Sequence, residues 1–213
     1  MTGNVTSDDG GGVDSNGTLR IVNSLIINNE AGDEAGGIDS GGGPATIIGT
    51  TISGNKAGSD GGGMQAQTPT TISRSRFIGN VAAGDGGGLV IVGGNTTTLN
   101  SVQFTNNTVG DDGGAIQVES TSTLNLNDSQ LSGNKADHDG GGIDNEGTTT
   151  LNRVQITSNT ADANANGLGD AGGFDNTGGT ATSTQTQISG NDDRSGDQFD
   201  NCRPANAIPG CAP

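Results

Sequence analysis

The chain has 213 residues, of which 41 are glycine, and only 28% are hydrophobic. Its net charge of −16 argues against nucleic acid and anionic membrane surfaces as partners, because both attract basic proteins. No apolar run approaches the length of about 18 residues that spans a bilayer, and no basic start followed by an apolar stretch predicts a signal peptide.

Asparagine recurs along the chain at nearly constant intervals. The positions are Asn4, Asn29, Asn55, Asn80, Asn107, Asn134, Asn159 and Asn191. The steps are 25 to 27 residues long, except for the last, which is 32. A fixed period of this length is typical of stacked repeats, whose narrow core needs few apolar side chains per repeat. The register argues against a disordered chain, although the composition alone would permit one.

Each repeat carries three apolar positions separated by polar turns. In the repeat at 99–118 these positions are Leu99, Phe104 and Ile116. Short runs that alternate with a period of two predict half-buried strands, and no segment has helical spacing. We therefore predict an all-β fold over residues 1–191: a parallel β-helix of about seven coils with three short strands per coil. The variable coil length favours the right-handed form.

The recurring asparagine lies three residues after an inward apolar residue, where a strand ends. Stacked amides stabilise strands that repeat along an axis. We therefore assign a structural role, rather than a ligand-binding one, to Asn29, Asn55, Asn80, Asn107, Asn134 and Asn159.

An acid follows most of these asparagines by five residues. This acid row consists of Asp9, Glu34, Asp60, Asp85, Asp112 and Asp139, and Asp170 continues it after an insertion. Like charges one coil apart repel by about 1 kcal/mol even in water. Backbone N–H groups of the following Gly-Gly turn could offset this repulsion, or Ca²⁺ could bridge adjacent coils through hard oxygen ligands. Asp85, Asp111, Asp112 and Asp139 are the candidate metal ligands, and Ca²⁺ is the one cofactor considered.

Two rows of polar residues are expected to face outward. One row consists of Arg20, Thr46, Thr71, Thr98, Asn125, Thr150 and Thr182, and the other of Leu25, Thr51, Arg76, Gln103, Gln130, Gln155 and Gln187. A flat threonine face could order water as ice-binding solenoids do. Asp128 and Arg153 fall one coil apart and are expected to pair. The longest turn, 160–169, has a composition that suggests flexibility but no identifiable chemistry.

The end of the chain departs from the repeat. Residues 192–213 are predicted to form a capping segment, in which Phe199 and Ile208 cover the last coil. Cys202 and Cys211 predict a disulfide-closed loop and hence an oxidising compartment, with a free thiol pair as the alternative. The first coil begins almost at Met1 without such a cap. We expect that end to follow more protein or to pair end to end with another chain.

Two sequence elements carry a family resemblance. Phe-Thr-Asn-Asn at 104–107 with Gly-Gly-Ala-Ile at 113–116 resembles the polymorphic outer membrane protein repeats, which combine FxxN with GGA[ILV]. The segments 51–64 and 131–143 are similar to the coils of bacterial secreted right-handed β-helix proteins. The resemblance covers about residues 4–191. It implies a secreted or cell-surface passenger domain, often adhesive, with a glycan or a host surface as partner.

We interpret the chain as a non-catalytic extracellular or cell-surface β-helix passenger, adhesive or structural. One alternative is a carbohydrate-active β-helix enzyme, a polysaccharide lyase or hydrolase; the other is an ice- or surface-binding protein. We predict no catalytic or cofactor-binding residue. His138 has no activated nucleophile beside it, and Arg74 and Arg76 are expected across the coil from the acid row.

Overall fold

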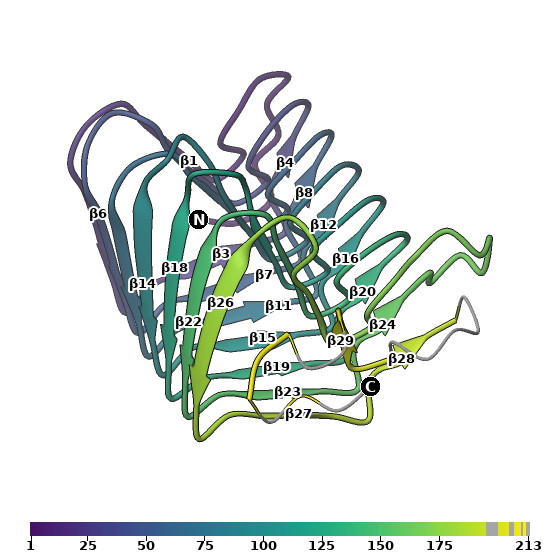
Figure 1. The fold of residues 1–213 in the computed structure, drawn as a ribbon. Helices are drawn as coiled ribbons and strands as arrows, with labels where there is room; N and C mark the ends of the chain where they lie inside the picture. Colours follow the sequence, from purple (N-terminus) through teal and green to yellow (C-terminus); the bar gives the residue numbers. More distant parts are fainter. Residues whose placement is uncertain (195–199, 205–206, 210, 212–213) are drawn as a thin grey trace.

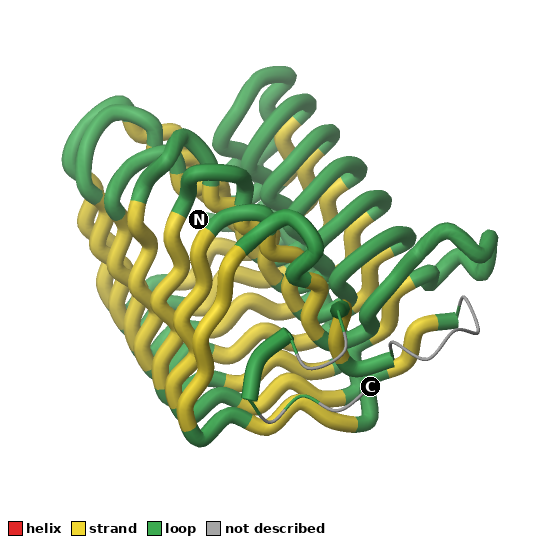
Figure 2. The backbone as a smooth tube through the Cα atoms, viewed as in Figure 1, coloured by secondary structure: helices red, strands yellow, loops and turns green. Residues whose placement is uncertain are grey.

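The computed structural model describes residues 1–194, 200–204, 207–209 and 211. The chain winds as a staircase in which equivalent strands of successive coils lie side by side and parallel (Figure 1). Strands and loops make up the described residues, with no helix among them (Figure 2). The predicted all-β fold, a right-handed parallel β-helix of about seven coils, is confirmed. The described residues accordingly form no helix that could serve as a transmembrane span.

Each full coil contributes four strands to four parallel sheets, where the sequence analysis predicts three. Sheet 1 contains β1 (Val13–Ser15), β5 (Ile38–Ser40), β9 (Met64–Ala66), β13 (Leu89–Ile91), β17 (Ile116–Val118), β21 (Ile143–Asn145), β25 (Phe174–Asp175) and β29 (Cys202–Arg203). Sheet 2 contains β2 (Leu19–Val22), β6 (Ala45–Ile48), β10 (Thr70–Ser73), β14 (Thr96–Asn100), β18 (Thr123–Asn127), β22 (Thr148–Asn152) and β26 (Thr180–Thr184).

The other two sheets complete the coil. Sheet 3 contains β3 (Leu25–Ile27), β7 (Thr51–Ser53), β11 (Arg76–Ile78), β15 (Gln103–Thr105), β19 (Gln130–Ser132), β23 (Gln155–Thr157) and β27 (Gln187–Ser189). Sheet 4 contains β4 (Glu30–Ala31), β8 (Lys56–Ala57), β12 (Val81–Ala82), β16 (Thr108–Val109), β20 (Lys135–Ala136), β24 (Thr160–Ala161) and β28 (Asp192–Asp193). The strands of sheet 4 are the unexpected ones, because two residues are too few for an alternating pattern to show.

The predicted apolar columns are confirmed in register. Leu99 pairs with Ile72, Phe104 with Phe77, and Ile116 with Leu89. All of these side chains are fully buried, and each stabilises the fold by about 1.5–3 kcal/mol. Phe77 and Phe104 stack with their ring centroids 4.6 Å apart. The core is therefore a set of side-chain stacks parallel to the solenoid axis.

The asparagine ladder satisfies the polar atoms of the amides in its interior, as Asn107 shows. The Oδ1 of Asn107 accepts from the N–H and the Nδ2 of Asn80, at 3.0 and 2.9 Å. Its own N–H and Nδ2 donate in the same way to Asn134, and its Nδ2 also donates to the carbonyl of Phe77 at 3.1 Å. The ladder runs from Asn4 to Asn191 and then continues to Asn201, which the period does not predict. The predicted structural role is consistent with this bonding.

The turn after each acid needs glycine for two separate reasons. Gly86 has a φ of +65°, which side chains rarely adopt, although Ala35 and Ala171 adopt it at the equivalent position. At Gly87 the constraint is space, because a Cβ there would lie 2.5 Å from the carbonyl oxygen of Gly114 in the next coil. The backbones of adjacent coils are therefore too close at this corner to admit a side chain.

The C-terminal segment both caps and extends the solenoid. β28 and β29 pair with β24 and β25, so the expected cap at 192–213 also adds strands to sheets 4 and 1. Cys202 and Cys211 form the predicted disulfide, and both are buried in the core cluster with Ile208. Phe199 lies outside the described residues.

The N-terminal residues lie along the first complete coil. Bridges join Thr2 to Ile27 and Val5 to Glu30, while β1 and β2 are the terminal strands of their sheets. End-to-end association through these edges stays a prediction. Sedimentation velocity that finds monomers alone across a wide concentration range would contradict it.

The ladder generates the first test. Asn107→Ala removes the hydrogen-bond partner of the N–H and Nδ2 of Asn80 and of the carbonyl of Phe77, all of which are buried. Each such loss costs about 1–3 kcal/mol, so we expect the free energy of unfolding, measured in urea by circular dichroism, to fall by roughly 3 kcal/mol or more. Asn106→Gly is the matched control, since Asn106 is exposed with a φ of +55° that glycine adopts freely. Equal stability of the two variants would contradict the role of the ladder.

Candidate functional site

The acid row lies at the turn between sheets 4 and 1, and its carboxylates bond along the solenoid axis. Oδ1 of Asp85 accepts from the backbone N–H of Asp112 at 3.0 Å, and Oδ1 of Asp112 accepts from that of Asp139 at 2.7 Å. The same bond joins Asp9 to Glu34, Asp60 to Asp85 and Asp139 to Asp170. The prediction that the Gly-Gly turns donate these hydrogen bonds is wrong. The donor is instead the next acid of the row, because backbone bonds between coils run parallel to the axis.

A second polar column lies beside this row on sheet 1 and was missed by the sequence analysis. It consists of the middle residues Asp14, Asp39, Gln65, Val90, Gln117 and Asp144, with Asp175 at the same position of β25. Its members are buried, apart from Asp14, although they point away from the apolar core. The available signal was an acid or amide directly after each inward residue, as in Ile38-Asp39 and Ile143-Asp144.

Together, the acid row and this column form what we name the acidic seam. Burial raises the pKa of Asp112 to about 7 and the pKa values of Asp39, Asp85 and Asp175 to about 6. Burial also raises the pKa of Asp144 well above its ordinary value, and the charge of Asp175 adds to the effect. Glu119 and Glu146, from loops between sheets 1 and 2, contribute further negative charge, since both interact with the acids of the seam. Part of the seam is therefore protonated near neutral pH.

Two buried oxygens of the seam have no hydrogen-bond donor. They are Oε1 of Gln117 and Oδ2 of Asp175. Gln117 hydrogen-bonds the carboxylate of Asp144, and Thr177 donates to the other carboxylate oxygen of Asp175. A cation could satisfy either oxygen, whereas a proton could neutralise only the carboxylate of Asp175.

The predicted metal ligands are only partly brought together. Within the described part of the chain, the set of ligand atoms that lie within 4.8 Å of one another is Asp111, Asp112 and His138. Asp85 and Asp139 lie one coil away on either side of Asp112 and do not join this set. His138 bonds Asp111 through Nδ1. Burial lowers the pKa of His138, but the bond to Asp111 and the nearby carboxylates outweigh it, so the pKa is raised.

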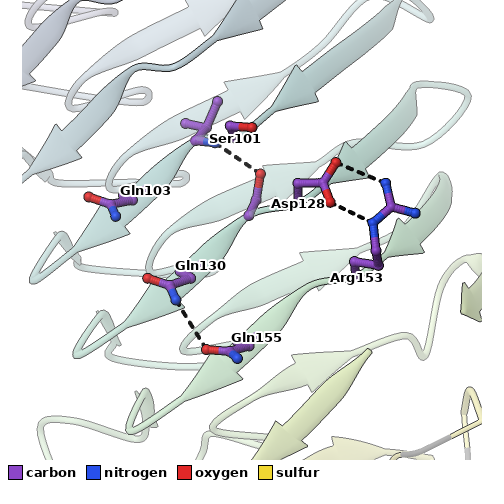
Figure 3. Close-up of a pocket in the computed structure, with 8 residues that line it drawn as sticks. Ser101, Gln103, Asp128, Gln130, Arg153 and Gln155 are labelled. Carbon is purple, nitrogen blue, oxygen red and sulfur yellow. Dashed lines mark hydrogen bonds and ion pairs between the residues drawn. The ribbon is translucent and has the colours of Figure 1, made fainter. Parts of the chain in front are cut away.

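The opposite corner of the coil, between sheets 2 and 3, holds two adjoining pockets that we name the corner furrow. The larger pocket, of about 380 Å³, is lined by residues 101–103, 128–130, 153 and 155. The smaller, of about 210 Å³, is lined by residues 74–76, 101 and 103. Ser101 and Gln103 line both, so the furrow crosses four successive coils. Figure 3 shows Gln103, Gln130 and Gln155 in line along one wall.

The predicted ion pair forms one side of the furrow. Nε and Nη2 of Arg153 donate to the two carboxylate oxygens of Asp128 at 2.5 and 2.9 Å (Figure 3). The pair lowers the pKa of Asp128 and raises that of Arg153. Gln130 donates to Gln155 at 3.1 Å, one coil along. Arg74 and Arg76 are exposed and have no carboxylate partner among the described residues.

The remaining predicted surfaces are present in register. The threonine row stays in register along sheet 2. Arg20 stands at its start, and Asn125 interrupts the threonines. The long loop after β24 projects from the coil (Figure 1). Its base is ordered by buried Asp162, whose carboxylate accepts from the N–H groups of Asn166 and Gly167.

One comparison with known proteins gives a match. Residues 101–119 match the family model of the Chlamydia polymorphic membrane protein (Chlamydia_PMP) repeat, as the resemblance of this segment predicts. No curated protein and no solved structure is significantly similar to the chain. The matched segment runs from the corner furrow through Asn107 and the Asp111–Asp112 pair into β17. A repeat of this type on a β-solenoid fits a surface-associated passenger domain.

The seam predicts that stability falls as the pH rises. Its carboxyl groups bind protons more tightly in the folded than in the unfolded chain, so stability is lost between pH 3.8, the ordinary pKa, and about pH 7, the pKa of folded Asp112. We expect a higher Tm at pH 5 than at pH 8, measured by circular dichroism in EDTA. Asp112→Asn, which keeps an oxygen for the N–H of Asp139, should raise Tm at pH 8 and reduce the difference.

The matched control is Asp8→Asn, which removes an equal charge at an exposed position. It should leave the difference between pH 5 and pH 8 unchanged. A wild-type Tm that rises from pH 5 to pH 8 would contradict the prediction.

Proposed function

We propose that this chain is a non-catalytic, secreted or cell-surface β-helix passenger that adheres to a glycan or host surface. The observation that carries the proposal is the polymorphic membrane protein repeat at 101–119 on a solenoid whose outward rows stay in register over seven coils. Such rows present a long and regular polar surface, which suits contact with an extended partner. The disulfide supports an oxidising, extracellular setting.

The distribution of charge supports binding rather than lyase chemistry. A β-helix lyase needs acids, a cation and a basic group together on one face. Here the acid row lies between sheets 4 and 1, whereas Arg74, Arg76 and Arg153 lie at the opposite corner. Arg203 does contact the row, but its guanidinium pairs with the carboxylate of Asp170. We therefore favour adhesion over the enzyme alternative.

Adhesion predicts retention under flow. Beads coated with the folded chain should stay on glycan-bearing cell layers at shear that removes beads coated with urea-denatured chain, because binding needs the in-register rows. Equal removal of both kinds of bead would refute the proposal. Release of unsaturated uronate from polyuronates in Ca²⁺ would favour the lyase, and thermal hysteresis of freezing would favour the ice-binding alternative.

We also propose that Ca²⁺ binds the acidic seam around Asp112. The support is the crowding of half-buried carboxylates with raised pKa values, and the carboxylate oxygens of Asp111 and Asp112 that lie within 4.8 Å of each other. Calcium takes six to eight such oxygen ligands. A cation there would replace the protons that the seam holds at lower pH.

Calcium should therefore raise the Tm at pH 8 relative to EDTA, because a ligand of the folded state stabilises it. The rise should be smaller at pH 5, where protons compete. It should shrink in Asp112→Asn and persist in Asp8→Asn. A Tm that is identical with Ca²⁺ and with EDTA at pH 8 would rule the site out.

A further inference from the structure

We propose that the corner furrow binds a linear acidic polysaccharide, one that carries carboxylate or sulfate groups, with its chain parallel to the solenoid axis. This inference rests on the proposed adhesive function and names its ligand class and its site. No residue of the furrow belongs to the acidic seam. The furrow therefore needs an explanation of its own.

The charge of the furrow opposes that of the molecule. The chain has 8 lysines and arginines and a net charge of −16. Three of the eight, Arg74, Arg76 and Arg153, line the furrow, where Asp128 is the one acid. Arg74 and Arg76 project from adjacent positions of one coil without a carboxylate partner. A cationic spot on so acidic a protein selects an anionic ligand, and acids elsewhere repel that ligand from the remaining surface.

The geometry of the furrow suits a repeating ligand. Equivalent side chains recur at the spacing of neighbouring strands, about 4.8 Å, which is close to the length of one ring in an extended sugar chain. Arg76, Gln103, Gln130 and Gln155 occupy one register position in four successive coils. Each coil therefore offers a polar side chain to successive sugar rings.

The furrow also holds unused hydrogen-bonding groups. Nε, Nη1 and Nη2 of Arg153 each make one bond, to Asp128 or Asn152, so two of its five N–H groups stay available. Asp128 thus holds this guanidinium at the edge of the furrow. The amide of Gln103 makes no side-chain hydrogen bond within the described residues, and Gln103 lines both pockets. Arginine binds carboxylate and sulfate through paired N–H groups, and amides bind sugar hydroxyls.

Ser101 makes the furrow continuous. It takes the corner position with a φ of +56°, where the neighbouring coils carry Arg74 and Asp128. Its short side chain leaves the larger and smaller pockets connected. A sugar chain could thus pass from Arg74 to Gln155 without crossing a bulky side chain.

Other classes of partner fit less well. Protein interfaces depend on buried tryptophan, tyrosine and arginine anchors, and this chain has no tryptophan or tyrosine. Nucleic acid needs an extended basic surface, which a chain of net charge −16 lacks. A sugar chain can be held by amides, hydroxyls and a few arginines, as the furrow provides.

Fluorescence anisotropy with labelled tetrasaccharides at low ionic strength tests the site. The probes are tetragalacturonate for carboxylate, a heparin tetrasaccharide for sulfate, maltotetraose as the neutral sugar, and a short single-stranded DNA. We expect one or both acidic sugars to bind, and binding to weaken as salt rises. Comparison of the two acidic probes shows whether carboxylate or sulfate is preferred. Binding of neither acidic sugar, or equal binding of maltotetraose or DNA, would overturn the proposal.

The variants separate a built site from general attraction. Arg74→Ala with Arg76→Ala should weaken binding at least about tenfold, because it removes the charge-assisted bonds. Arg20→Ala with Lys135→Ala removes the same charge at exposed positions elsewhere and should leave binding within about twofold. Ser101→Phe should block binding without a change in charge. Equal loss in the two double variants, or full binding by Ser101→Phe with an unchanged Tm, would contradict the furrow.

Bead retention and tetrasaccharide binding together distinguish a failure of the proposed adhesion from a failure of the furrow as its site. If Arg74→Ala with Arg76→Ala abolishes tetrasaccharide binding and also bead retention, both stand. If bead retention persists in that double variant, adhesion stands and the furrow is not its site. Loss of retention by the wild-type chain itself, with tetrasaccharide binding intact, would instead refute adhesion and leave the furrow as a binding site.

Discussion

The structure depends on one geometric constraint: each residue lies over its equivalent in the coils before and after it. Any side chain must therefore tolerate its own kind at about 4.8 Å. Apolar residues satisfy this by stacking, as Phe77 and Phe104 do. Asparagine satisfies it better than other polar residues, because an amide carries both donors and acceptors and can bond its own copy. The ladder through Asn107 uses all of these atoms while buried.

The same constraint destabilises the fold where carboxylate side chains stack. Stacked acids bring like charges together, and burial adds desolvation, so the fold raises the pKa of Asp112 to about 7. Hydrogen bonds from the next coil lower this cost without removing it. The acidic seam is thus the part of the solenoid in which protonation and folding are most strongly linked.

The sequence predicted the repeating apolar columns, but it missed elements too short to show a pattern and features formed by several coils together. Leu99, Phe104 and Ile116 were placed in their columns because a period of 25 to 27 residues fixes register once one coil is understood. The strands of sheet 4 were missed because two residues show no alternation. Asn201 was missed because the period breaks before it. The furrow depends on how loops and corners of four coils approach one another, which a linear pattern does not specify.

The solenoid separates its charges by position around the coil. In order along the chain come sheet 1, sheet 2, the furrow corner, sheets 3 and 4, and then the acid row, so Arg74, Arg76 and Arg153 lie at the corner opposite the acid row. Arg203 is an exception, because it pairs with Asp170 at the C-terminal end of the row. The two proposed ligands, which have opposite charge, would therefore bind at different corners of the coil. The matched repeat at 101–119 links these corners within a single coil. One repeat unit thus carries Ser101 and Gln103 at one corner and Asp111 and Asp112 at the other, and stacking turns each set into a continuous surface.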